Sequence, residues 1–183
     1  MKKIFAVLFC MFAVAVTATT VKAQEDSDKT TVKLTFRNAD DTKSSWPFAE
    51  KKFSKDAGVT DVTLTSKKSG HVFEIVSTTP MYLNSKAGFM FGGEEGNYMT
   101  LPAVKGKTLK KVFIKFGGKG ALGVPCIADH KGNVLVGGSP TKSPEENATH
   151  TWKVSGLKKG KAAKLMLTTD GMLKLKTLVL TYE

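Results

Sequence analysis

The sequence is nearly free of cysteine, with Cys10 and Cys126 as its two thiols. Cys10 lies in an N-terminal segment that we expect to be removed, so the remaining chain has one thiol and no internal disulfide. Cys126 stands in the apolar run VPCIA, a setting that favours a small buried hydrophobic residue over a catalytic nucleophile. A hydrophobic core, rather than cross-links, must therefore hold the fold.

Arginine is also nearly absent. Arg37 is the only one, although the chain has 28 basic and 16 acidic side chains. Arginine is the usual reader of phosphate groups and base edges, whereas lysine is a hydrated point charge. The lysines are scattered and often alternate with apolar residues, as in KLKTL (174–178), which is typical of a solvated strand face. This pattern argues against specific nucleic-acid recognition and leaves open attraction to a polyanion such as an acidic glycan, lipopolysaccharide or nucleic acid.

Long apolar runs are limited to IFAVLFCMFAVAV (4–16), which is shorter than the roughly 18 to 20 residues that span a bilayer. Lys2 and Lys3 precede this run, and Val21 and Ala23 occupy the −3 and −1 positions of a small-residue cleavage site. This layout is that of a secretory signal peptide, with an uncleaved membrane anchor as the alternative.

The chain is therefore expected to be exported to the periplasm, the outer surface or the medium. We expect residues 1–23 to be a cleaved signal peptide, 24–30 a disordered polar leader, and 31–183 a single domain. The mature chain then keeps 25 basic and 16 acidic side chains, a net charge of +9. It contains no further run of transmembrane length.

No segment after residue 23 carries a helical stripe over ten or more residues; the best candidate is one helical turn after Pro47 in SSWPFAEKKF (44–53). Period-two alternation, which is typical of half-buried strands, takes its place. About ten short strands separated by turn signals predict an all-β fold, an antiparallel β-sandwich of the jelly-roll type. The strand-like segments are 31–37, 59–66, 71–78, 89–91, 97–104, 110–116, 123–129, 133–138, 149–156, 163–169 and 173–183.

One glycine motif suggests an enzyme, because GKGALG (118–123) matches G-x-G-x-x-G and follows a strand-like segment. A dinucleotide fingerprint needs a helix after its glycines, but Pro125 and the apolar run VPCIA predict another strand. Nucleophile elbows and P-loops are absent from the sequence. We therefore expect no enzyme, although a hydrolase with two carboxylates on separate strands stays open, because such a pair leaves no local motif.

Metal and cofactor signals are weak. His71, His130 and His150 lack the spacing of a helical zinc pair. The acidic run EDSD (25–28) lies in the leader, and ADHKGN (128–133) has a single acid, so neither resembles an EF-hand loop. We expect no cofactor, with calcium as the alternative.

Candidate ligand-binding residues fall in two aromatic positions and one turn. Trp46 lies in the irregular segment SSWPF, where it either plugs one end of the sandwich or stacks on a ligand. Tyr98, which follows the turn GGEEGN, is open to the same two interpretations. Polar contacts to a ligand are predicted in one tight loop, where an ordinary hairpin turn is the alternative: Asp129, His130, Lys131 and Asn133.

The segment GNYMTLPAVKGKTLKKVFIKF (96–116) resembles a Tyr-x-x-Leu-Pro-x-x-x-Gly-Lys-x-Leu-x-x-Val pattern in secreted and surface proteins of Bacteroidetes, whose domains look like galactose-binding-type jelly rolls. The segments SSWPF, THTWKVSG and LVLTYE fit the same layout, and VKAQ resembles the cleavage site common in that group. The resemblance covers about residues 31–183. It implies the jelly-roll fold and export, and it carries no catalytic residues to this chain.

The sequence thus favours a non-catalytic binding module of the periplasm or cell surface, with carbohydrate as the expected ligand. Carbohydrate is chosen by analogy with the commonest use of such folds. A structural or protein-interaction domain of a surface assembly is the main alternative, and a polysaccharide hydrolase is the third.

Overall fold

The structure is a computed structural model that describes residues 28–36, 46–51, 53–84, 87–118, 122–138, 145 and 147–183. The proposed signal peptide and most of the leader lie outside these residues. The described residues form twelve strands: β1 (Thr30–Thr35), β2 (Asp61–Thr65), β3 (Val72–Val76), β4 (Tyr82–Asn84), β5 (Gly88–Gly93), β6 (Tyr98–Leu101), β7 (Leu109–Phe116), β8 (Pro125–Asp129), β9 (Val134–Gly137), β10 (Thr149–Lys153), β11 (Ala163–Leu167) and β12 (Gly171–Tyr182).

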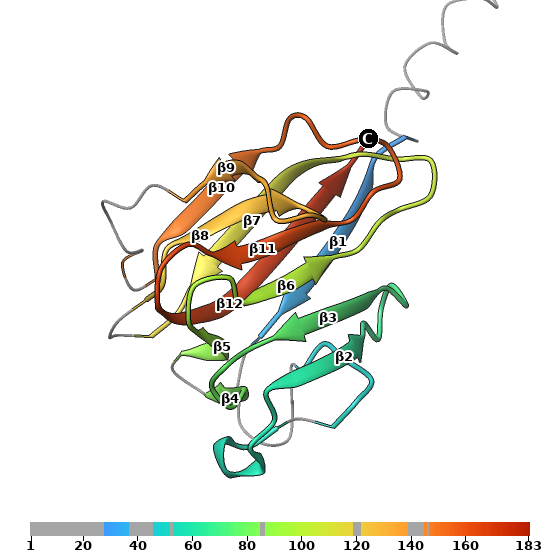
Figure 1. Ribbon diagram of the computed structural model, residues 1–183. Coiled ribbons are helices and arrows are strands. Elements are labelled where there is room, and N and C mark those ends of the chain that lie inside the picture. The colour runs from blue at the N-terminus through green and yellow to red at the C-terminus, as the bar shows by residue number, and fades with distance from the viewer. Residues whose placement is uncertain are drawn as a thin grey trace, which may run out of the picture.

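The strands form two six-stranded sheets, and every named strand pair is antiparallel (Figure 1). The first sheet has the order β10-β7-β12-β5-β4, with β1 also paired to β12; the second has the order β2-β3-β6-β11-β8-β9. The predicted all-β sandwich is confirmed.

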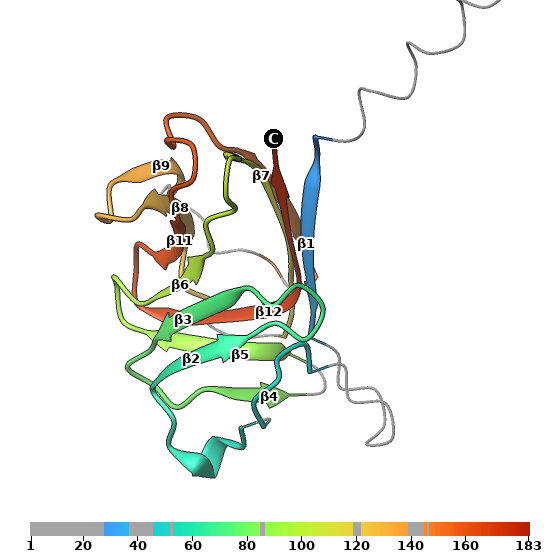
Figure 2. The same ribbon diagram turned by 90° about the vertical axis from the view of Figure 1, so that its right-hand side faces the viewer.

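Strand β12 organises the first sheet because it is long enough to pair twice. Its first half lies beside β5, and its second half lies between β7 and β1, with an irregularity in the β7 register between Leu175 and Thr177. Beyond this irregularity the sheet consists of the four strands β10-β7-β12-β1. Figure 2 shows this part edge-on, with the second sheet on one side of it.

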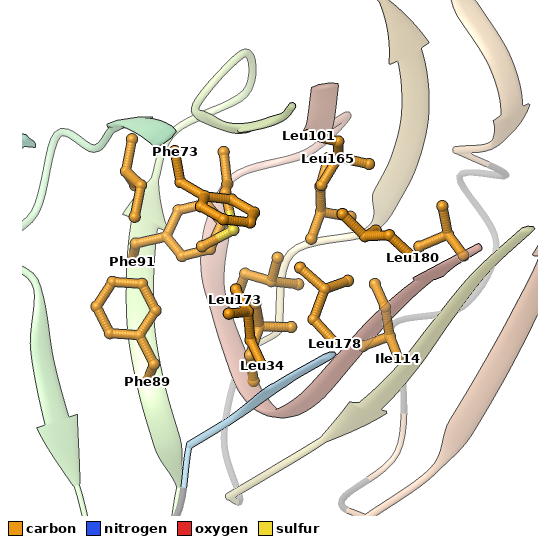
Figure 3. Packing of buried hydrophobic residues seen from close by; sticks show 14 of the residues in the cluster. Leu34, Phe73, Phe89, Phe91, Leu101, Ile114, Leu165, Leu173, Leu178 and Leu180 are labelled. Carbon is orange, nitrogen blue, oxygen red and sulfur yellow. The ribbon is translucent and has the colours of Figure 1, made fainter. Parts of the chain in front are cut away.

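Alternation in the sequence explains which side chains are buried. Val32 and Leu34 of β1, Val112 and Ile114 of β7, and Leu178 of β12 point into the sandwich and are at most 2% exposed. They meet residues of the second sheet, such as Phe73, Leu101 and Leu165, in one continuous hydrophobic cluster (Figure 3). Removal of this apolar surface from water is the main stabilising contribution to the fold.

Sequence prediction failed at two places. Strand β4 was missed, because three residues are too few to show a period. The helical turn expected after Pro47 is wrong: Phe48 forms an isolated bridge with Ser66, and among the described residues the helical segment is the 3-10 helix η2 (Lys55–Ala57). The apolar side chain of Phe48 is fully buried, so pairing with the second sheet places it better than a surface helix would.

The glycine motif lies between two strands, as expected, and β8 follows it where a dinucleotide fold would have a helix. Gly118 has a φ of 66°, which a residue with a side chain rarely adopts. Gly123 packs against the chain at Leu167 and Thr169, where a Cβ atom would lie 2.7 Å from a Leu167 methyl carbon. Lys119, Gly120 and Ala121 lie outside the described residues.

Candidate functional site

The candidate site is a groove of about 570 Å³ between the free edge of β1 and the turn that joins β2 to β3. Figure 2 looks onto this edge of the sandwich. Hereafter called the edge groove, it is lined by Thr31, Val32, Lys33, Thr35, Trp46, Pro47, Ser66, Lys67, Lys68 and Ser69. Its volume falls within the range of small-molecule sites, roughly 300 to 1,000 Å³.

Local structure places the polar side chains of the groove. Val32 and Leu34 point into the core, so Thr31, Lys33 and Thr35 necessarily point outward from β1. The opposite wall is a tight turn, in which Gly70 N–H donates to Ser66 O and Lys67 N–H donates to Pro47 O. Lysine and hydroxyl side chains therefore face each other across the edge of the sandwich.

The electrostatic character of the groove is uniformly basic. Lys33, Lys67 and Lys68 are exposed, and none of them forms an ion pair with any residue that the structure describes. The described lining residues include no carboxylate. Four hydroxyl groups complete the polar set, so the groove offers cationic donors together with neutral groups that donate and accept.

Trp46 lines this groove but is only 4% exposed. Its ring makes edge contacts with Phe48, Phe53 and Phe89 at centroid distances of 5.1 to 5.8 Å, and its indole N–H donates to Glu50 O at 2.7 Å. The surrounding residues match the interpretation of Trp46 as a plug, and they leave no open ring face on which a sugar could stack.

Tyr98 lies on the outer face of the second sheet and is partly exposed. The Lys164 ammonium sits 4.1 Å from the centroid of its ring, a cation–π contact. Burial, followed by the nearby Glu74 carboxylate, raises the pKa of the Tyr98 phenol. A stacking ligand would have to displace Lys164 or approach from the opposite side of the ring.

The predicted polar loop is the turn between β8 and β9. The Asp129 carboxylate accepts hydrogen bonds from the backbone N–H groups of Lys131 and Asn133 and from the Asn133 side-chain amide. The hydrogen bond from the Asn133 side chain is the main reason that the pKa of Asp129 is lowered. These contacts give Asp129 a structural role in the hairpin, while His130 and Lys131 are exposed.

The structure does not gather the six predicted residues into one pocket. Asp129 on β8 pairs with Ala163 on β11, which pairs with Leu101 on β6. Tyr98 lies three residues before Leu101 on β6, so the Cα atoms of Asp129 and Tyr98 are about 14 Å apart. Trp46 belongs to the edge groove, which none of the other five residues lines. Two features therefore lie on one sheet, and the third lies at the edge of the sandwich.

The groove residues that sequence reasoning missed are Ser66, Lys67, Lys68 and Ser69 on one side and Thr31, Lys33 and Thr35 on the other. A signal for the second group was present, since these three residues occupy the polar phase of an alternating strand. No sequence signal joined them to the turn, because only tertiary structure brings β1 beside the β2–β3 connection.

In the part of the chain that the structure describes, no three His, Cys, Asp or Glu side chains gather as a metal site requires, and no helix there is long and apolar enough to span a membrane. The expectation about calcium stays a prediction. Comparisons with protein-family models, with curated proteins and with solved structures gave no match to this chain.

Proposed function

We propose that this chain is an exported, non-catalytic binding module whose ligand is a glycan held in the edge groove. The lining of the groove carries the proposal. Hydroxyl groups of Thr31, Thr35 and Ser69 and the ammonium groups of Lys67 and Lys68 provide donors and acceptors of the kind that bind sugar hydroxyls. Export is supported by the layout of residues 1–23 in the sequence.

The apolar part of the groove supports the same ligand class. Pro47 and the small exposed part of Trp46 line it beside these polar groups. Ligand sites commonly combine apolar walls with a few placed polar groups, and the C–H faces of a pyranose ring need such a wall. A glycan fits both parts of the lining.

The test is calorimetric titration of the protein with short neutral and acidic oligosaccharides. We expect at least one of them to bind, and we expect K67Q/K68Q to weaken that binding about tenfold or more. The control K158Q/K159Q removes two exposed lysines from the β10–β11 connection and should leave the affinity unchanged. Absence of binding by every oligosaccharide, or equal loss in the control, would contradict the proposal.

A second candidate is a protein-interaction domain, and the free edge of β1 favours it. Phe36 N–H donates to Lys176 O, which fixes the phase of the β1–β12 ladder. Thr31, Lys33 and Thr35 therefore direct their backbone N–H and C=O groups away from β12. No strand in the described part of the chain pairs with this edge, so an extended peptide could add to it.

Hydrogen exchange separates the two candidates. A peptide strand added to β1 would protect the backbone amides of Thr31, Lys33 and Thr35 from exchange. A glycan bound by side chains would leave those three amides exchanging as in the free protein.

A further inference from the structure

The strand register shows which residues lie side by side on the outer face of the β10-β7-β12-β1 sheet. Alternate residues of these four strands align in three rows across the sheet. The rows are Thr31–Thr181–Lys111–Lys153, Lys33–Val179–Phe113–Thr151 and Thr35–Thr177–Lys115–Thr149. We call these twelve residues the threonine–lysine face.

The face consists of six threonines, four lysines, one phenylalanine and one valine. All twelve are exposed or partly exposed. None of the twelve is acidic, and none of the four lysines forms an ion pair with a residue within the described ranges. The face thus has four positive charges without a compensating negative charge of its own.

One pair of lysines shows that this arrangement is unfavourable in the free protein. Lys111 and Lys153 are directly opposite each other on β7 and β10. Like charges at such positions destabilise a sheet. An anionic group bound between the two ammonium groups would offset this repulsion, so the face is electrostatically complementary to a ligand that presents repeated negative charges.

The shape of the face limits the kind of ligand. Its Cα positions span about 14 Å across the strands and about 14 Å along them. Each outer strand contributes two threonines, Thr31 and Thr35 on β1 and Thr149 and Thr151 on β10. The Phe113 ring lies between Thr151 and Val179 in the middle row. This layout suits an extended chain that offers hydroxyls, anionic groups and C–H surfaces together.

Other polyanions fit this face less well. The described residues include no arginine to read bases or grip phosphate in the bidentate manner. The most exposed large hydrophobic side chains, Val72 and Val134, belong to β3 and β9 of the second sheet. On the face itself only Phe113 and Val179 are apolar, and both are partly buried, which is less apolar surface than a membrane-binding face presents.

We propose that the threonine–lysine face binds an acidic polysaccharide, a linear glycan with carboxylate or sulfate groups, which continues from the edge groove across β1. Thr31, Lys33 and Thr35 line the groove and also belong to the face, so the two surfaces are continuous. The choice of a glycan rests on the proposed function. Beyond that function, the face assigns the glycan to the acidic class and offers its chain a second binding surface.

The test compares dextran sulfate and polygalacturonate with neutral dextran as ligands, each over a series of salt concentrations. The variant K111Q/K115Q/K153Q removes three charges from the face at sites away from the groove. We expect it to bind both acidic polymers at least tenfold more weakly, with the slope of log K against log salt reduced by roughly two to three. Neutral dextran should show no dependence on these lysines.

The matched control is K158Q/K159Q/K161Q, which removes three exposed lysines from the loop between β10 and β11. Thermal unfolding should confirm that both triple variants are folded. Equal weakening by the control would overturn the proposal, because it would assign binding to overall charge. Equally tight, face-dependent binding of duplex DNA or of phosphatidylglycerol vesicles would overturn the assignment to polysaccharide.

The groove variant K67Q/K68Q keeps the two proposals separable. If short oligosaccharides fail to bind while dextran sulfate still depends on Lys111, Lys115 and Lys153, the groove proposal fails and the face stands. If short oligosaccharides bind and dextran sulfate ignores those three lysines, the face proposal fails and the groove stands.

Discussion

At the scale of single residues, Tyr182 links β12 to the connection that follows β6 through a side-chain hydrogen bond. Its hydroxyl donates to Pro102 O at 2.8 Å, and the side chain is 1% exposed. Burial raises the pKa of this phenol far above its ordinary range, so the group is neutral and donates throughout the physiological range.

The hydroxyl of Tyr182 can be removed without changing the ring. We expect Tyr182→Phe to lower the free energy of unfolding by about 1–3 kcal/mol, because the buried Pro102 carbonyl loses its donor. Urea denaturation measures this change. Tyr82→Phe is the control, since the Tyr82 hydroxyl donates no hydrogen bond to a described residue, and a similar loss there would contradict the explanation.

Cys126 is the residue for which the sequence interpretation and the structure agree most directly. The side chain is fully buried, and burial raises the pKa of its thiol to about 11. Because the thiolate is the reactive form, these properties fit a packing role rather than a nucleophile.

Asp129 gives the hairpin between β8 and β9 a dependence on pH. Its pKa in the folded protein is lowered, chiefly by the hydrogen bond from Asn133, so the unfolded chain takes up the proton more readily. The contribution of Asp129 is therefore complete above the unfolded-state pKa and is lost as the pH falls through the folded-state value.

This linkage predicts that the wild-type protein loses more stability than D129N between about pH 6 and about pH 3. Urea denaturation of both proteins at the two pH values measures this difference in stability loss. The contributions of the other carboxyl groups cancel in the comparison, because those groups titrate in both proteins. Equal losses in wild type and D129N would contradict the prediction.

At the scale of elements, the start of β12 depends on a close approach of two backbones. Gly171 has a φ of 133°, and a Cβ atom there would lie 2.6 Å from Gly123 N. Neither of these two backbone segments can move without disturbing the strands beside it. Position 171 therefore requires glycine for two reasons, its positive φ and the lack of space for a Cβ atom.

A pair of substitutions separates these two requirements. We expect Gly160→Ala to cost about 1–2 kcal/mol, because Gly160 has a φ of 69° but nothing within 4 Å of its Cβ position. Gly171→Ala should cost about 2 kcal/mol more, owing to the steric overlap. Chemical denaturation of both variants tests this order, and equal costs would show that the backbones separate freely.

At the scale of the whole molecule, one hydrophobic cluster joins the two sheets. Trp46 reports on the β1 side of this cluster, and Trp152, on β10, packs partly buried against it on the other side. A domain with one core unfolds as a unit, so both tryptophans should lose their native environments together.

The prediction is that W152F and W46F, each with a single remaining tryptophan, show fluorescence transitions that coincide with far-UV circular dichroism. Within each variant, the fluorescence transition is compared with the circular dichroism transition. The midpoints of the two variants are not compared with each other, because Trp46→Phe disturbs the core. Separate transitions for the two probes within one variant would indicate units that unfold independently.

Alternation in the sequence alone determined the class of fold and most of the strands. Eleven of the twelve described strands coincide with predicted strand segments. In most of them the apolar residues recur at every second position, while β5, β8 and β9 lie in short continuous apolar runs. That signal is local, because the core-facing residues must alternate along each strand. The same periodicity also fixed the polar faces, including Lys111, Phe113 and Lys115 of β7, where an aromatic residue stands out of phase with its apolar neighbours.

Tertiary structure decided which of those polar faces lie side by side. Thr31, Lys111, Lys153 and Thr181 are far apart in the chain and form one row only because β1, β12, β7 and β10 pair in that order. The sequence likewise left Trp46 open between a plug of the sandwich and a ligand-stacking residue, and only the folded structure packs Phe48, Phe53 and Phe89 around its ring. Strand pairing depends on contacts between distant segments, which local periodicity does not encode, so the surfaces proposed for binding appear only in the folded protein.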